Sequence, residues 1–181
     1  MSGDLRMDNV DRVFGVFDVD GDGVLSWGDF SAAARGVGRE FGLGVEAVEV
    51  RNLVAAYRAV WEYLAGADAD ADGVVSREEF RAAHESGRLS TGGLLERWLV
   101  VSGRNFELAD RDGDGALDGS EFAGIYRGVG VTDPQVAAIA FAGMDVDGDG
   151  RVDRAEFSTH VRGFFTASDA SVKGARMLSG G

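Results

Sequence analysis

The stretch DVDGDGRVDRAEF at residues 145–157 decides the fold, because the chain contains the same pattern three more times. The other copies are DVDGDGVLSWGDF at 18–30, DADADGVVSREEF at 68–80 and DRDGDGALDGSEF at 110–122. Each copy fits D-x-D-x-D-G-x5-[D/E] and is followed by Phe. A single copy is compatible with an ordinary polar turn, since Asp and Gly favour turns. Four copies with the same trailing aromatic residue indicate one repeated unit.

The spacing of the acidic residues is typical of a loop that surrounds a divalent cation. Ca²⁺ prefers six to eight oxygen ligands at roughly 2.3–2.6 Å, and a 12-residue loop supplies them from positions 1, 3, 5, 7, 9 and 12. Position 7 uses its backbone carbonyl, so its side chain varies, and position 9 often acts through water. Position 6 needs a positive φ, which Gly adopts without strain. All four loops have glycine there: Gly23, Gly73, Gly115 and Gly150.

These positions predict four sites for Ca²⁺, numbered along the chain. The predicted ligands of site 1 are Asp18, Asp20, Asp22, Val24, Ser26 and Asp29. Those of site 2 are Asp68, Asp70, Asp72, Val74, Ser76 and Glu79. Those of site 3 are Asp110, Asp112, Asp114, Ala116, Asp118 and Glu121. Those of site 4 are Asp145, Asp147, Asp149, Arg151, Asp153 and Glu156.

Apolar residues at helical spacing precede each loop and predict a helix on each side of it. Position 8 of the loops is always apolar, which predicts a short β-bridge between loops 1 and 2 and another between loops 3 and 4. The position-8 residues are Leu25, Val75, Leu117 and Val152. We therefore expect an all-α fold of four helix–loop–helix units in two packed lobes, residues 1–90 and residues 91–181, the second with a C-terminal tail. No long polar linker separates the halves, so the lobes are expected to pack together.

Four helix–loop–helix units of this kind resemble the EF-hand superfamily. Within it, the chain resembles the sarcoplasmic calcium-binding proteins and their bacterial calerythrin branch. The resemblance rests on total length, the long connection 30–67, Asp29 closing loop 1, and Trp61-Glu62-Tyr63-Leu64 before loop 2. It implies a compact helical Ca²⁺ buffer. The second site is often degenerate in that family, whereas loop 2 here keeps its three Asp residues and Glu79.

The four sites are not expected to be equivalent. Glu at position 12 reaches the cation with both oxygens, whereas Asp29 is one methylene shorter and is expected to use one oxygen. Mg²⁺ prefers six-coordinate geometry at shorter distances. Site 1 is therefore predicted to bind Ca²⁺ most weakly or to accept Mg²⁺ most readily.

Composition and the start of the sequence limit the classes of binding partner and the location that we expect. The net charge is −13, which disfavours nucleic acid and anionic membranes. There is no cysteine, and no apolar run approaches the roughly 18 residues that span a bilayer. The polar start Met1-Ser2-Gly3-Asp4 lacks the apolar segment of a secretory signal, so a cytoplasmic location is expected. We expect a monomer.

A sensor opens on binding Ca²⁺ and exposes a Met-rich groove to a target protein. Only four methionines occur, at positions 1, 7, 144 and 177, and they do not cluster. A buffer or storage role is therefore favoured, with a Ca²⁺ sensor that binds a target protein as the alternative. An enzyme is not expected, because His84 and His160 are the only histidines and neither lies in a catalytic motif. We predict no catalytic residues and no organic cofactor.

Overall fold

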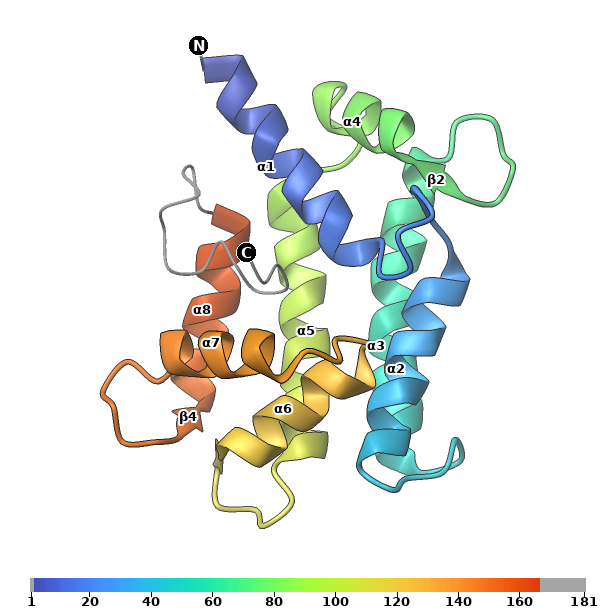
Figure 1. The fold of residues 1–181 in the computed structure, drawn as a ribbon. Coiled ribbons are helices and arrows are strands. Elements are labelled where there is room, and N and C mark those ends of the chain that lie inside the picture. Colours follow the sequence, from blue (N-terminus) through green and yellow to red (C-terminus); the bar gives the residue numbers. More distant parts are fainter. Residues whose placement is uncertain (1, 167–181) are drawn as a thin grey trace.

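The computed structural model describes residues 2–166, with side chains described from Val10 onward. This part of the chain forms eight α-helices, a short 3₁₀ helix η1 (Ala65–Ala67) and four two-residue strands (Figure 1). The helices are α1 (Ser2–Phe17), α2 (Trp27–Glu40), α3 (Val48–Leu64), α4 (Arg77–Glu85), α5 (Thr91–Ala109), α6 (Gly119–Gly128), α7 (Pro134–Met144) and α8 (Arg154–Thr166). The predicted all-α class is confirmed. The C-terminal tail that follows Thr166, with Met177, lies outside the described residues.

The four strands form two antiparallel bridges between paired loops. The strands are β1 (Val24–Leu25), β2 (Val75–Ser76), β3 (Ala116–Leu117) and β4 (Val152–Asp153). Leu25 lies opposite Val75, and Leu117 lies opposite Val152. These four position-8 side chains are fully buried. The predicted pairing of loop 1 with loop 2 and of loop 3 with loop 4 is confirmed.

Helix α5 continues through an interruption in its apolar stripe. The apolar stripe before loop 3 is interrupted at Ser102-Gly103, yet α5 runs without a break from Thr91 to Ala109. Ser102 is buried and Gly103 has open space around its Cα. A single Gly costs a helix about 1 kcal/mol relative to Ala. The packing of the buried face of α5 outweighs that cost.

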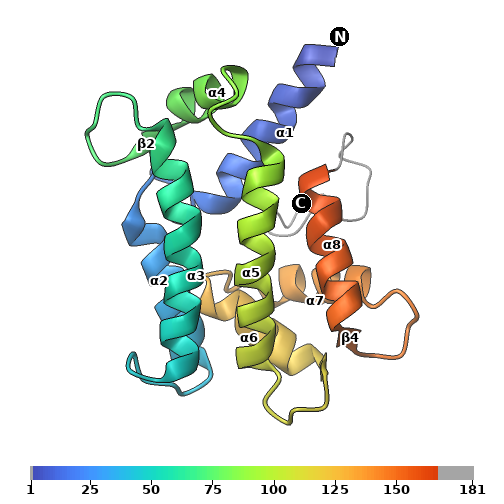
Figure 2. The ribbon, with the colours of Figure 1, turned by 180° about the vertical axis from the view of Figure 1, so that it is seen from behind.

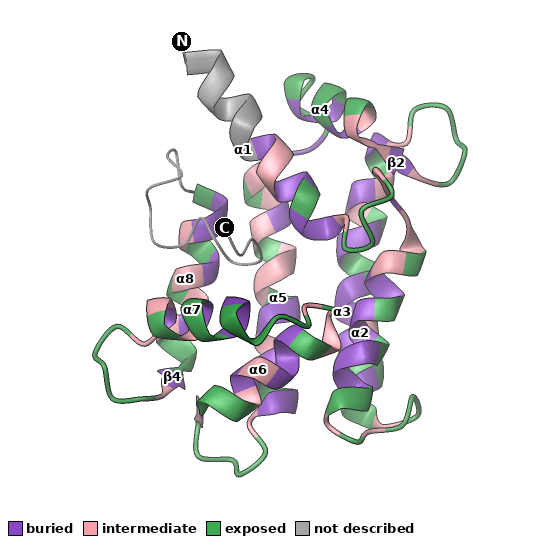
Figure 3. Cartoon of the chain, viewed as in Figure 1, coloured by how far each residue is buried: buried purple, intermediate pink, exposed green. Residues whose placement is uncertain are grey.

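The two lobes pack directly against each other. Helix α3 lies along α5, and α2 crosses α6 (Figures 1 and 2). Figure 3 shows buried residues on the inner sides of these helices, whereas the four loops are largely exposed. The rings of Phe17 and Tyr57 make T-shaped contacts with Trp98 on α5, with centroid distances of 5.0 and 5.8 Å. The two lobes therefore share an aromatic core.

Two glycines make the α2–α6 crossing possible. A Cβ on Gly36 would overlap the carbonyl of Gly128, and a Cβ on Gly128 would overlap the backbone of Val37. Any side chain at either position would push the helices apart. At this crossing the two lobes therefore meet backbone to backbone.

Candidate metal centres

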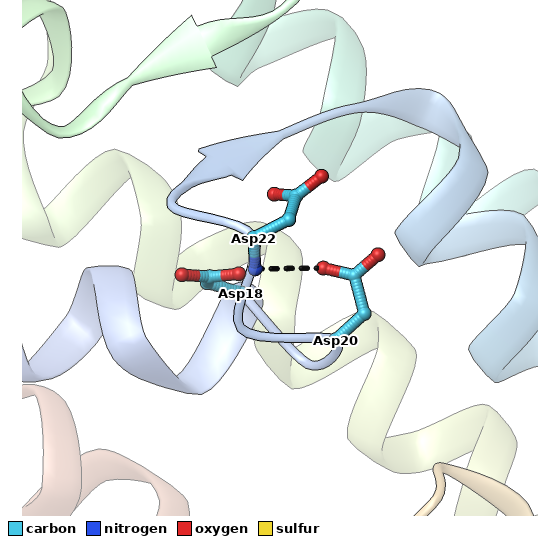
Figure 4. A group of neighbouring side chains, drawn as sticks. All are labelled: Asp18, Asp20 and Asp22. Atoms are coloured by element: carbon cyan, nitrogen blue, oxygen red, sulfur yellow. Dashed lines mark hydrogen bonds between the residues drawn. The ribbon is translucent and has the colours of Figure 1, made fainter.

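Each loop brings three carboxylates close together. In loops 1 and 2 these belong to positions 1, 3 and 5, and in loops 3 and 4 to positions 1, 3 and 12. Within each group, one oxygen from every residue lies within 4.8 Å of the others. Figure 4 shows Asp18, Asp20 and Asp22 in one turn of loop 1, with the Asp22 N–H directed at Asp20. Like charges at such distances repel each other, so the arrangement favours a bound cation.

The loop backbone is folded around its own carboxylates. In all four loops the position-6 glycine N–H donates to the position-1 carboxylate, at 3.0–3.2 Å. The position-7 N–H donates to the position-5 carboxylate at 2.8–3.0 Å. The position-5 N–H donates to the position-3 carboxylate at 3.2 Å. These bonds explain why Asp, whose short side chain reaches nearby backbone, occupies positions 1, 3 and 5.

Position 4 also has a left-handed backbone, which sequence reasoning missed. Loops 1, 3 and 4 have glycine there, with φ between 71° and 74°. Loop 2 has Ala71 with φ 61°, the single non-glycine residue with positive φ among the described residues. The glycine at position 4 in three of four loops was the signal that could have revealed this requirement. Loop 2 therefore carries a local strain that the other loops avoid.

Position 9 and position 12 form a capping box at the start of the next helix. Ser26, Ser76 and Asp118 are the N-cap residues of α2, α4 and α6, and the position-12 carboxylate accepts from the N-cap N–H in each. In loop 4 the N–H groups of Asp153 and Glu156 donate to each other's carboxylates, at 3.0 and 2.8 Å. The predicted ligands at these two positions therefore also fix where the next helix begins.

The position-12 glutamates hold both ends of their loops. In loop 2, one Glu79 oxygen accepts from the Ala69 N–H at 2.8 Å and the other from the Ser76 N–H at 2.9 Å. Glu121 and Glu156 make the equivalent pairs of bonds. Bonds from the backbone of Ser76 and then Ala69 lower the pKa of Glu79 below its usual value. In each of these three loops, one carboxylate joins the start of the loop to its end.

Loop 1 closes differently. Both the N–H and the hydroxyl of Ser26 donate to one Asp29 oxygen, at 2.7 and 2.8 Å. The Val19 N–H donates to the Phe17 carbonyl instead of to Asp29. The shorter side chain therefore holds the end of loop 1 but not its start.

Loop 1 also contains an unsatisfied ligand atom. The Asp18 Oδ1 atom is buried and has no hydrogen-bond partner among residues 2–166. A buried carboxylate oxygen without a partner is costly, whereas a hard cation would satisfy it. The carboxylate group in each loop fits a divalent metal such as Ca²⁺, and in loop 1 the unpaired Asp18 oxygen fits one as well.

An ion pair links loops 3 and 4. Arg151, at position 7 of loop 4, donates to the carboxylate of Asp114, at position 5 of loop 3. From its place in the loop, Arg151 is expected only as a backbone ligand. The predicted β-bridge could have revealed the pair, because it brings the residue before Val152 close to loop 3.

The two histidines have structural surroundings. His84 is buried in α4, packs on Phe80 and contacts the Phe80 carbonyl through Nδ1 at 2.9 Å. His160 lies in α8, where burial lowers its pKa. Neither belongs to the carboxylate groups described above.

Comparisons with known proteins agree with this geometry. The EF-hand domain pair family matches residues 103–162, and the EF hand family matches residues 10–32 and 66–83. Calerythrin from Saccharopolyspora erythraea is 31% identical over 166 residues, covering 88% of this chain and 92% of calerythrin. No helix in residues 2–166 is long and apolar enough to cross a membrane.

Solved structures are similar over most of the chain. A calcium-binding protein of Streptomyces coelicolor is 32% identical, with a TM-score of 0.75. Its structure is described as the structural basis for prokaryotic calcium-mediated regulation by that protein. The match covers 88% of this chain and 96% of that one. Apo-aequorin in complex with (S)-HM-daCTZ has a TM-score of 0.68 at 17% identity, covering 96% and 89% of the two chains. That second likeness concerns the fold alone.

Proposed function

We propose that this chain, which belongs to the EF-hand family of calcium-binding proteins and is a relative of calerythrin, is a calcium buffer. In this proposal it has four cation sites. The proposed ligands are the residues at positions 1, 3, 5, 7, 9 and 12 of each loop. The observation that carries the proposal is the grouping of three carboxylates within 4.8 Å in every loop. We also propose that residues 1–90 and 91–181 form the two lobes, each with one pair of sites.

A buffer binds the cation without presenting a new surface to a partner. Two features support this role. The aromatic residues Phe17, Tyr57 and Trp98 pack across the two lobes, and Met144, the methionine whose side chain is described, is buried. A fixed core of rings suits storage better than a flexible Met-rich groove. The cytoplasmic location, the monomeric state and the absence of catalysis stay predictions.

Site 1 is proposed to be the weakest for Ca²⁺ or the most tolerant of Mg²⁺. Asp29 bonds to the end of loop 1 through one oxygen, while the glutamates of the other loops use both. A shorter carboxylate favours lower coordination, which suits Mg²⁺.

Titration calorimetry with Ca²⁺, in the absence and presence of millimolar Mg²⁺, tests this function. We expect four binding equivalents, one of which is suppressed by Mg²⁺. Because a ligand that binds only the folded state stabilises it by roughly 2.7 kcal/mol at 100 times its dissociation constant, chelation should also lower the melting temperature. A melting curve unchanged by chelator would contradict the proposal.

The alternative function is a calcium sensor that regulates a target protein. The observation that favours it is the likeness to the Streptomyces coelicolor protein, whose description refers to regulation. Dye binding to apolar surface with and without Ca²⁺ separates the two roles. A large Ca²⁺-induced increase favours the sensor, and little change favours the buffer.

A further inference from the structure

A cavity of about 180 Å³ lies where the two lobes meet. Its walls come from the end of α1 and from α2, α3, α5 and α6, with Met144 and Phe157 closing one side. These helices converge near the middle of the molecule in both views of the ribbon (Figures 1 and 2). The cavity adjoins site 1, because the proposed ligands Asp18 and Asp29 form part of its wall, whereas no residue of loops 2, 3 or 4 lines it.

Six of the 19 residues in the wall are aromatic: Phe17, Phe30, Tyr57, Trp98, Tyr126 and Phe157. Trp98 makes T-shaped contacts with both Phe17 and Tyr57, at interplanar angles of 68° and 88°. Tyr126 and Phe157 line the cavity as well. Aromatic rings favour stacked or edge-on contacts with another flat ring. This lining therefore favours a flat aromatic occupant over a branched aliphatic one.

Besides Asp18 Oδ1, which belongs to site 1, a second buried polar atom in the wall lacks a partner in the described part of the chain. Asn105 is 6% exposed, and its Oδ1 atom accepts no hydrogen bond from residues 2–166. The Asn105 amide also interacts with the Tyr57 side chain, and both residues line the cavity. A buried carbonyl left unpaired is unfavourable, and a single N–H or O–H from an occupant would satisfy it.

The charge of the wall and the volume of the cavity limit the charge and size of a ligand that could bind there. Asp18 and Asp29 of loop 1 form part of the wall, so an anion is disfavoured. A metal bound at site 1 would neutralise these carboxylates and remove any attraction for an organic cation. An engineered apolar cavity of about 150 Å³ binds benzene. The present cavity therefore suits a neutral ligand of one or two rings.

We propose that this interlobe cavity is a binding site for a small neutral aromatic molecule that donates one hydrogen bond to Asn105. The site is additional to the four cation sites and is not part of calcium buffering.

Indole is the probe, because it has two fused rings and one N–H, and 1-methylindole is its matched comparator without the donor. Both are titrated by calorimetry into the full-length, Ca²⁺-loaded protein. Intermolecular nuclear Overhauser effects then locate the bound probe. We expect saturable binding, contacts from indole to Trp98 and Met144, and affinity for indole roughly five-fold above that for 1-methylindole.

Two variants and a control test the location. Ser102→Leu fills the cavity from α5 and should weaken indole binding at least ten-fold. Asn105→Leu keeps the size of the side chain but removes the acceptor, so the preference for indole over 1-methylindole should disappear. Val100→Leu adds a methylene at an exposed position on the same helix and should leave indole binding unchanged. Calcium titration of each variant checks its fold and reports separately on the proposed buffer function.

The proposal is overturned if indole shows no saturable binding to the folded protein, which would mean that the cavity holds buried water only. It is equally overturned if folded Ser102→Leu binds indole normally. If Ser102→Leu does not fold, the nuclear Overhauser effects in the unaltered protein provide the test. The absence of contacts from indole to Trp98 and Met144 would then overturn the proposal.

Discussion

Loops 1 and 2 face each other across one two-residue bridge, yet each departs from the common pattern at a different point. Loop 1 has glycine at its left-handed position 4 but closes with the short Asp29. Loop 2 closes with Glu79, which bonds to both ends of the loop, but places Ala71 at position 4 with φ 61°.

This difference separates two properties of a cation loop. The position-12 carboxylate joins the start of the loop to the beginning of the next helix, so its length decides whether the loop is closed before the metal arrives. The position-4 residue decides how much backbone strain that closed conformation contains. Loop 2 is therefore closed but strained, and loop 1 is unstrained but incompletely closed.

Removing the closing carboxylate of loop 2 should have the largest effect. In Glu79→Ala the N–H groups of Ala69 and Ser76 lose a charged acceptor, and the site loses a proposed ligand. We expect Ca²⁺ affinity at site 2 to fall about 100-fold, since each charged hydrogen bond contributes roughly 1.5–3 kcal/mol. Calorimetry measures the loss. Glu78→Ala, next in the chain, is the control, and an equal loss in both variants would refute the closing role of Glu79.

Lengthening the closing residue of loop 1 should remove the contrast between the two loops. Asp29→Glu supplies the methylene needed to reach the Val19 N–H. We expect the preference of site 1 for Ca²⁺ over Mg²⁺ to rise about 10-fold, the equivalent of one charged hydrogen bond. Competition titration with both cations measures the change. If the selectivity at site 1 does not rise, side-chain length is not the cause.

Relieving the strain in loop 2 should give a smaller gain. Ala71→Gly removes the Cβ from a left-handed residue, and we expect the folded protein to be stabilised by about 1 kcal/mol. Denaturant unfolding with chelator present measures this without a contribution from bound metal. Ala69→Gly in the same loop lacks the positive φ, so it should give no gain; stabilisation by both variants would argue against strain at Ala71.

The smallest effect is expected in the other lobe, where an ion pair joins the two loops. Arg151→Gln frees Asp114 of loop 3. Exposed ion pairs contribute about 0.2–1 kcal/mol, so Ca²⁺ affinity at site 3 should rise by no more than about five-fold, and less at high salt. Arg154→Gln is the control, because Arg154 pairs with Glu107 rather than with a proposed ligand. Equal effects of the two variants would indicate a change in net charge only.

The sequence predicted the local parts of this structure well. The pairing of Leu25 with Val75 follows from an apolar residue at the same position of two adjacent repeats. The helices on either side of each loop follow from apolar residues at helical spacing. Such features depend on residues that are close in the chain or related by the repeat.

Features that join distant residues were not predictable from the sequence in this way. Nothing in the pattern around Gly36 indicates that it meets Gly128, because that contact depends on how α2 crosses α6. The cavity beside Asn105 likewise arises from helices of both lobes. At the sites, the sequence indicated which residues to consider as ligands, but it did not reveal that Asp29 fails to reach the start of loop 1.

The glycine crossing also limits how the gene can change. Every single-base substitution in a glycine codon that alters the amino acid introduces a Cβ, and at Gly36 or Gly128 that atom would overlap the backbone of the opposite lobe. A larger residue at one position cannot be compensated by a smaller residue at the other, because the other is already glycine. Mutational drift should therefore be slow at these two helix positions even though neither lies in a cation loop. In homologues that have lost either glycine, α2 and α6 should cross at a different angle or a larger distance.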